Sequence, residues 1–367
     1  MVLTLSMVLI FQLAYSSKLE LRMAKNSRDE DRIYYALRGA VLKAEAILRN
    51  DATRTQGGSV DSLQEEWAAG PLTESFGEVQ VDIRIEDEER RFNLLHLTAL
   101  GSKAKEKEFI KKARETLESI LVDFRSGTDG EISASVAREL VRKMEAWVNR
   151  GARDRIPPAP TESGNKMLTL DELLLLEDDE ISPYLLYDQW DAESEVLIPG
   201  LSRYVTLWSN GLVNINTADL VVLRGLLSER NREHAEAIIE YRGDLEEGVT
   251  DARRVDKDRA EDEANTGIFE QVQDLTGNNV IPADAFAEIE NLVDVSSQVF
   301  SVWVTAKQGK IRKCVRVLFR REGSKLFTIL WEERPDLRIP DEGPYAEEED
   351  QEKSFFGLTS PLPFPSR

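Results

Sequence analysis

The sequence is poor in the residue types that most catalytic and metal sites use. Its 367 residues include one cysteine, Cys314, and two histidines, His96 and His234. A single cysteine cannot form a disulfide within the chain, and no cysteine–histidine cluster has the spacing of a zinc site. The sequence also lacks a P-loop, a dinucleotide fingerprint and a nucleophile elbow. These absences argue against an enzyme, and we expect His96 to be a strand residue without a catalytic role.

Positive charge is also scarce. The chain carries 47 Lys and Arg against 68 Asp and Glu, a formal net charge of −21. Such a balance repels nucleic-acid phosphates unless a local basic patch overrides it. The length and the 41% of hydrophobic residues are sufficient for two or three compact units without disulfide or metal crosslinks. We therefore expect a folded, acidic protein.

The N-terminal run from Met1 to Tyr15 has no charged side chain, and the first acid of the chain is Glu20. A membrane-spanning helix needs roughly 20 apolar residues, so this run is short, and a cleaved secretory signal is the alternative interpretation. Apolar residues continue at helical spacing, which predicts one helix over residues 1–50, about 75 Å long, with its apolar start at a membrane or filament core. The face that we expect to contact partner helices consists of Ile33, Leu37, Val41, Ala44 and Leu48.

Strand-like alternation appears in two separated parts of the chain. Residues 78–85 alternate apolar and polar side chains, and we expect residues 92–97 to pair with them as an antiparallel strand after a charged turn. Three more strands are predicted near residues 300–304, 315–319 and 325–331, with turns at Gln308-Gly309 and Gly323-Ser324. The five strands together predict one antiparallel sheet packed on the C-terminal half of the first helix.

Between the two strand groups the pattern is helical. Residues 103–124 and 132–147 read as amphipathic helices, and a further helical group begins at residue 168. Residues 171–195 hold ten acids and no Lys or Arg, which is typical of a solvated face. The predicted fold class is α+β, with a long hydrophobic N-terminal helix, an antiparallel sheet and a large inserted all-α domain. The expected divisions are the helix at 1–50, the sheet domain at 51–100 and 296–332, the inserted domain at 101–295, and a flexible tail at 333–367.

The most specific short motif is Asn214, Ile215, Asn216, Thr217 and Ala218, within a segment, 211–275, that is similar to SAM-like or helix-hairpin-helix modules. Asn216 or Thr217 is expected to cap a helix that begins at Ala218. Such hairpins suggest DNA binding as an alternative function. The glycine pair that contacts phosphate is absent, however, and residues 211–274 contain eight basic and sixteen acidic side chains. This segment therefore has a net negative charge, whereas phosphate binding requires a net positive one.

The order of parts resembles minor pseudopilin K of the type II secretion pathway. The family has a D-E-x-G-R-[LIV]-N-[LIV]-N run, which Glu88, Glu89, Arg91 and Asn93 approximate; the Asn-Ile-Asn-Thr-Ala motif matches better. The resemblance implies a pilin-like α/β domain with an inserted helical domain. It also implies a non-enzymatic subunit that initiates and caps the pseudopilus at its tip, together with the minor pseudopilins I, J and H. The expected location is the bacterial inner membrane, with a single pass and the bulk of the chain in the periplasm.

Two features bear on the tip position. In a stack of pilin-type helices, a buried N-terminal amine requires a carboxylate from its neighbour. No acid precedes Glu20 here, so this subunit would not neutralise the amine of a subunit added above it. The large helical insertion would also obstruct addition. The family further implies a leader peptide ahead of the apolar run.

Members of this family can hold calcium, for which clustered carboxylates are the required ligands. One candidate cluster consists of Asp251, Asp256, Asp258, Glu261, Asp262 and Glu263, and another spans Glu177 to Glu180. Neither contains the D-x-[DN]-x-[DN]-G loop. The sequence therefore names calcium as the expected ion without fixing its ligands.

Overall fold

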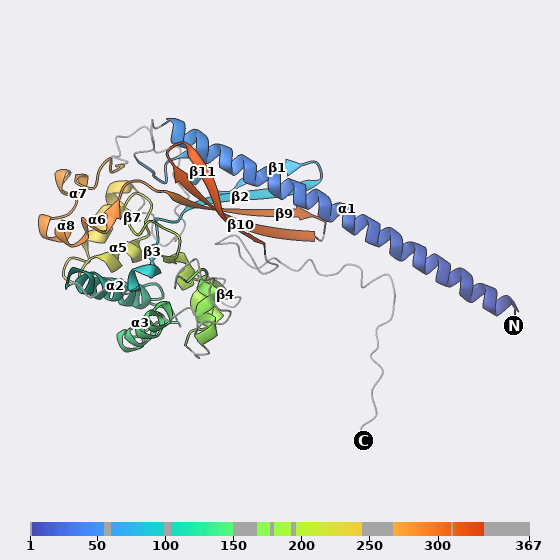
Figure 1. Cartoon of the computed structure of the whole chain (residues 1–367), viewed down its shortest axis with the longest axis horizontal. Coiled ribbons are helices and arrows are strands. Elements are labelled where there is room, and N and C mark those ends of the chain that lie inside the picture. The colour runs from blue at the N-terminus through green and yellow to red at the C-terminus, as the bar shows by residue number, and fades with distance from the viewer. Residues whose placement is uncertain are drawn as a thin grey trace, which may run out of the picture.

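The computed structural model describes residues 2–54, 60–98, 104–128, 130–149, 167–176, 180–191, 196–243, 267–309 and 311–333. Figure 1 shows a long helix that lies along one face of a sheet and projects well beyond it, with a helical unit at the opposite end of the sheet. The fold confirms the predicted class, a long N-terminal helix with an antiparallel sheet and a large helical portion. The predicted tail and the acidic segment 251–263 lie outside the described residues, apart from Glu333.

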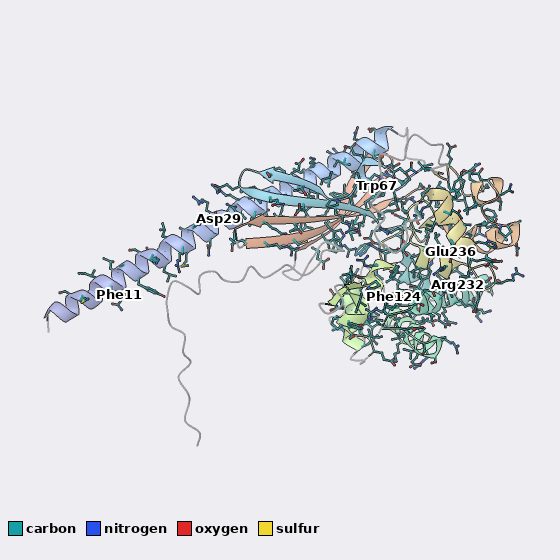
Figure 2. All side chains as sticks on the ribbon, turned by 180° about the vertical axis from the view of Figure 1, so that it is seen from behind. Phe11, Asp29, Trp67, Phe124, Arg232 and Glu236 are labelled. Atoms are coloured by element: carbon teal, nitrogen blue, oxygen red, sulfur yellow. The ribbon has the colours of Figure 1, made fainter. Side chains whose placement is uncertain are left out.

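Helix α1 spans Val2–Arg54, as the apolar spacing predicts. Between residues 6 and 28, every side chain that the structure describes is exposed. Contact with the sheet begins at Asp29, whose Oδ1 accepts a hydrogen bond from Gln308 Nε2 at 3.4 Å. Figure 2 shows Phe11 on the projecting part and Asp29 where the sheet begins. The helix therefore has a projecting half and a packed half.

The sheet has five strands in the order β1-β2-β9-β10-β11, and every neighbouring pair is antiparallel. The strands are β1 Leu72–Phe76, β2 Val79–Asp87, β9 Val299–Gln308, β10 Ile311–Glu322 and β11 Lys325–Glu333. The predicted pairing of the strand near residue 80 with the C-terminal strands is confirmed, because Ile83 pairs with Val304 in the β2–β9 register. Both predicted turns are also confirmed, with Gly309 and Gly323 at positive φ.

The prediction that residues 92–97 form a sheet strand is wrong. Residues Leu72–Phe76 pair with β2 instead, and only Phe92–Asn93 is extended, as β3, in a parallel pair with β6 Val205–Thr206. Leu94–Leu97 forms a 3₁₀ helix, η2, which buries Leu94 and Leu97 in the helical unit. Leu94 and Leu97 are three residues apart, which suits the three-residue period of a 3₁₀ helix. The charged residues before Phe92, which the prediction placed in an exposed turn, are mostly buried.

The core of the sheet lies between α1 and one sheet face. Ile33, Leu37, Val41, Ala44 and Leu48 all belong to this core, together with Val302, Val304, Val315 and Val317. The chain's own sheet thus covers the helix face that we assigned to partner helices. The helical periodicity identified an apolar face correctly, but the face packs within the chain.

The helical unit has a second, larger core. The two predicted amphipathic helices are confirmed as α2, Ala104–Asp123, and α3, Ala134–Val148. The leucine-rich segment forms only a 3₁₀ helix, η4 Leu170–Leu176. The remaining short elements are η1 Glu66–Ala68, α4 Pro183–Leu186, β4 Gln189–Asp191, β5 Val196–Ile198, η5 Leu201–Arg203, β7 Val213–Asn214, α5 Leu220–Leu226, α6 His234–Arg242, α7 Asp274–Gly277, α8 Ala283–Ile289 and β8 Val293–Asp294.

Candidate functional site

The two sequence motifs meet in a buried polar junction between the sheet and the helical unit. The first motif leaves the end of β2, and the second follows β7. Glu88 and Glu89 are each 0% exposed, and Asp87 is 1% exposed. Carboxylates are rarely buried so completely without partners, so each of the three is expected to have hydrogen-bond donors or cations beside it.

Arg91 neutralises two of the acids. Its Nη2 lies 2.6 Å from Glu86 Oε2, and its Nη1 lies 2.8 Å from Glu88 Oε1. Burial alone would raise the pKa of Glu86, but Arg84 and Arg91 lower it well below its ordinary value. Burial likewise opposes ionisation of Glu88, yet the nearby arginines lower its pKa to about 2. Both acids are therefore ionised in the fold, and they hold Arg91 in place.

Asp87 connects the first motif to the second. Its Oδ2 accepts hydrogen bonds from Thr217 Oγ1 at 2.5 Å, Ser297 Oγ at 2.6 Å and Asn214 Nδ2 at 3.3 Å. Burial nonetheless raises the pKa of Asp87 to about 6, and the hydrogen bonds from Ser297 and Thr217 only partly oppose this shift. Asp87 thereby ties β2, the motif after β7 and the segment before β9 to one carboxyl group.

Glu89 fixes the backbone on both sides of the junction. Its Oε2 accepts from the amide of Val299 at 2.9 Å, and its Oε1 accepts from the amide of Asn210 at 3.2 Å. Its carbonyl oxygen also accepts from the amide of Asn214 at 2.9 Å. Burial, followed by the charge of Asp87, raises the pKa of Glu89 well above its ordinary value. These contacts give the motif a positioning role rather than a chemical one.

The second motif differs from its predicted role as a helix cap. The cap of α5 is Asp219, whose Oδ1 accepts from the amide of Val221 at 2.9 Å. Asn216 instead forms two hydrogen bonds with the backbone of Phe269, at 2.9 and 3.0 Å, and Thr217 binds Asp87. Ile215 and Ala218 are buried in the helical core. The motif therefore joins segments that are distant in sequence, which its local pattern did not reveal.

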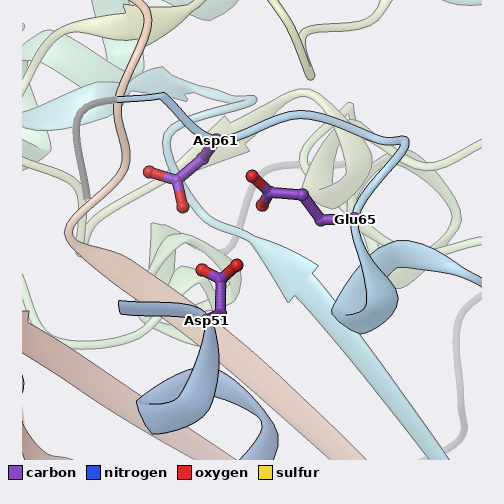
Figure 3. A group of neighbouring side chains, drawn as sticks. All are labelled: Asp51, Asp61 and Glu65. Carbon is purple, nitrogen blue, oxygen red and sulfur yellow. The ribbon is translucent and has the colours of Figure 1, made fainter. Parts of the chain in front are cut away.

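A trio of carboxylates, Asp51, Asp61 and Glu65, has the geometry of a metal site, with one oxygen of each within 4.8 Å of the others. Figure 3 shows the three carboxyl groups converging from the end of α1 and from the segment before β1. The sequence did not single out this trio, because its members are not clustered at ligand spacing. Burial, together with the charge of Asp51, raises the pKa of Glu65 to about 7.

Arg321 already supplies a cation to this trio. Its Nη1 lies 3.0 Å from Asp51 Oδ2, and its Nη2 lies 2.5 Å from Asp61 Oδ2. A guanidinium that bridges two of the three ligands leaves little room for a divalent ion, so the trio as arranged does not fit calcium. Of the sequence-based calcium candidates, the structure describes only Glu180, which is half exposed and lies 3.1 Å from Lys143. Calcium binding by those segments stays a prediction.

The projecting half of α1 exposes many large apolar side chains. Phe11 is 75% exposed. Other large apolar side chains exposed on this half are Met7, Leu9, Ile10, Leu13, Tyr15, Leu19, Leu21 and Met23. Within the described ranges, no helix combines the length and the apolar character that crossing a membrane requires. So large an apolar surface on a folded protein usually marks an interaction site.

Comparison with known proteins identifies the class of fold. No family model matches the sequence, and no curated protein is similar to it. The structure matches a chain in the crystal structure of the GspK-GspI-GspJ complex from the type 2 secretion system of enterotoxigenic Escherichia coli. The match has a TM-score of 0.53 and 15% sequence identity, and it covers 85% of this chain and 99% of the other.

The chain therefore has a pseudopilin-like fold. At the level of the fold, the match agrees with the resemblance that the order of motifs indicated. The alignment includes almost all of the solved chain, so the likeness extends beyond the sheet to the helical unit. At this level of identity the comparison establishes the fold, and function requires a separate argument.

Proposed function

We propose that this chain is a non-enzymatic minor pseudopilin of the K type, which assembles with other minor pseudopilins at the tip of a type II secretion pseudopilus. The structural likeness to a chain of the GspK-GspI-GspJ complex carries this proposal. The buried junction agrees with a structural role, because its carboxylates form ion pairs with arginines and hydrogen bonds with backbone amides and side-chain hydroxyls. The absence of a nucleophile motif from the sequence points in the same direction.

The projecting half of α1 is the proposed assembly surface. Burying one large exposed apolar side chain yields about 1.5–3 kcal/mol, so several of them would drive association with similar helices. The packed half of α1 is already covered by the sheet, and this leaves the projecting half as the part that enters a bundle. We propose that its N-terminal end reaches the inner membrane while the sheet and the helical unit lie in the periplasm.

The placement of the helical unit supports the tip position. This unit lies at the end of the sheet opposite the projecting end of α1 (Figure 1). If α1 runs in parallel with its neighbours in a filament, the helical unit stands at the outer end and obstructs a further subunit. Residues 1–19 add an electrostatic reason, since they contain no acid and offer no carboxylate to the amine of a further subunit.

Co-purification of the full chain with its cognate I and J subunits tests this function. The double variant F11E/L21E places two charges on the projecting half of α1, and we expect at least a tenfold loss of complex. L175E is the matched control, because Leu175 is 46% exposed but lies in the helical unit. Complex formation that survives the double variant, or that never occurs with the wild-type chain at micromolar concentration, would refute the assembly surface. The H subunit is expected to join the same complex.

The alternative of DNA binding is not favoured. Three arginines of the hairpin segment face carboxylates. Arg224 Nε donates to Glu236 Oε1 at 2.9 Å, and Arg230 Nη2 lies 2.9 Å from Asp284 Oδ2. Arg232 pairs with Asp123, and Figure 2 places Arg232 in the helical unit. Arginines engaged by carboxylates contribute little to phosphate binding. We expect no retardation of duplex DNA by the purified chain at moderate salt.

A further inference from the structure

The projecting half of α1 carries an excess of positive charge. Residues 1–28 contain four basic side chains and one acid, in a chain whose net charge is −21. The basic residues are Lys18, Arg22, Lys25 and Arg28, and the acid is Glu20. Three consecutive acids follow at residues 29–31, where α1 reaches the sheet (Figure 1). The positive charge is therefore confined to the part of the helix ahead of the sheet.

Three of these cations share one side of the helix. Lys18, Arg22 and Lys25 are separated by four and three residues, so they project from neighbouring positions, here called the cationic face. All three are exposed, and no carboxylate among the described residues forms an ion pair with them. Glu20 lies about 160° from Lys18 around the helix axis. The cationic face therefore presents three charges that the chain itself leaves uncompensated.

The cationic face directly follows the apolar end of α1. Phe11 is 75% exposed and Tyr15 is 66% exposed, and tyrosine is enriched where a membrane meets water. Lys18 and Lys25 are about 10 Å apart along the helix axis. A headgroup layer is roughly 5–8 Å thick, and long lysine and arginine side chains extend a few Å along the axis toward it. When the apolar end lies in a membrane, the cationic face is therefore at the depth of the headgroups.

We propose that the cationic face binds the headgroups of anionic phospholipids on the membrane surface next to the sheet. The proposal rests on the proposed function, which puts the N-terminal end of α1 in the inner membrane. Headgroup phosphates have the complementary charge, and arginine binds phosphate through paired hydrogen bonds. Only about 6 Å of helix separates Lys25 from Asp29, where the sheet begins. The contact therefore holds the sheet close to the membrane, and salt weakens it because it is electrostatic.

The apolar side chains beside the cationic face favour lipid over an acidic partner helix. Leu19, Leu21 and Met23 are all exposed and alternate with the cations along the chain. Leu19 and Leu21 point to nearly opposite sides of the helix, about 160° apart. A partner helix covers one side, whereas lipid surrounds the helix of a single subunit before assembly. Mixed apolar and cationic side chains on several sides of a helix suit the membrane–water boundary.

Sedimentation of the full chain with lipid vesicles tests this contact. At low salt, the wild type should bind vesicles rich in phosphatidylglycerol about a hundredfold more tightly than vesicles of phosphatidylcholine alone, since each of three cations contributes about fivefold. The variant K18Q/R22Q/K25Q should lose most of this preference, and high salt should remove it from the wild type. The control K107Q/K111Q/R138Q removes the same charge at exposed positions of the helical unit and should keep the preference.

An equal preference of the wild type and K18Q/R22Q/K25Q for anionic vesicles would overturn the proposal. So would competition by inorganic phosphate at constant ionic strength, because the ligand would then be free phosphate. A variant that keeps its lipid preference but no longer co-purifies with the I and J subunits would assign the cations to a partner protein instead. K18E/R22E/K25E should prefer vesicles that contain a cationic lipid, which would support a direct charge contact. Circular dichroism verifies that each variant is folded. The vesicle assay contains no pseudopilin partner, so its failure is distinguishable from failure of the proposed assembly role.

Discussion

The hydroxyl of Thr217 donates a hydrogen bond of 2.5 Å to Asp87 Oδ2 although 130 residues separate the two in sequence. This contact joins the two motifs on which the family resemblance depended. It places residues of both motifs at one structural joint, where the sheet meets the helical unit. The motifs are thus explained by the fold of a single subunit rather than by a reaction.

The variant T217V should weaken this joint. Valine keeps the shape of threonine but removes a donor to a buried carboxyl group, a loss of about 1.5–3 kcal/mol in the free energy of unfolding. T73V is the control, because Thr73 also donates to an aspartate, at 2.7 Å, but at an exposed position. Denaturant unfolding monitored by circular dichroism measures both. Equal, small effects of the two changes would contradict the importance of the joint.

Arg321 should be essential for stability. R321M leaves Asp61, which is 1% exposed, buried without its cation, and breaking a buried pair in this way costs about 3–5 kcal/mol. R320M alters the neighbouring arginine, whose ion pair with Glu322 is half exposed, and should cost about 0.5 kcal/mol or less. Thermal unfolding of the two variants under the same conditions provides the comparison. A mild R321M phenotype would indicate that Asp61 is neutralised in another way.

Stability should depend on pH in two opposite ways. The pKa of Asp87 is raised to about 6 in the folded chain by burial, so the folded state binds a proton more tightly and stability falls as pH rises from about 4 to about 6. Arginines lower the pKa of Glu88 to about 2 despite burial. The contribution of ionised Glu88 to the stability of the fold is therefore present above its pKa in the unfolded chain, and it is lost as the pH falls toward 2. An optimum near pH 4–5 follows from these two groups.

The variant D87N isolates the first effect. Asparagine does not titrate, so the decrease in unfolding free energy between pH 4 and 6 should be smaller than in the wild type. E78Q is the control, because Glu78 is exposed, and its pH profile should follow that of the wild type. Denaturant midpoints at a series of pH values measure the three profiles. A D87N profile parallel to the wild type would assign the titration to another group.

Gly225 should resist substitution for a packing reason. A Cβ at this position would lie 2.8 Å from Ile120 Cγ1 and 3.2 Å from the carbonyl oxygen of Thr116, because α5 packs closely on α2. Overpacking of this kind costs about 1–3 kcal/mol, so G225A should be destabilised despite the better helix propensity of alanine. G277A has open space around the new Cβ and should be close to neutral. If the two variants unfold at equal denaturant concentrations, α5 and α2 are less tightly packed than described.

The apolar periodicity of the sequence was sufficient for the elements whose structure is local. It predicted α1, the helices α2 and α3, and the strands β9, β10 and β11, because each buries one face and that face repeats at a fixed spacing. It also predicted that the strand near residue 80 joins the C-terminal strands. The same periodicity did not reveal what covers an apolar face, and so Ile33 and Leu37 were assigned to a partner rather than to the chain's own sheet.

The buried polar junction could be recognised only from the tertiary structure. A run such as residues 86–91 looks like an exposed charged turn, and only the fold shows that Arg91 neutralises Glu86 and Glu88 while Asp87 and Glu89 bind distant amides and hydroxyls. The sequence by itself determined the order of elements and the acidic charge, since both depend on neighbouring residues. The tertiary structure decided which charges are buried, because neutralisation requires partners that the chain brings together only on folding.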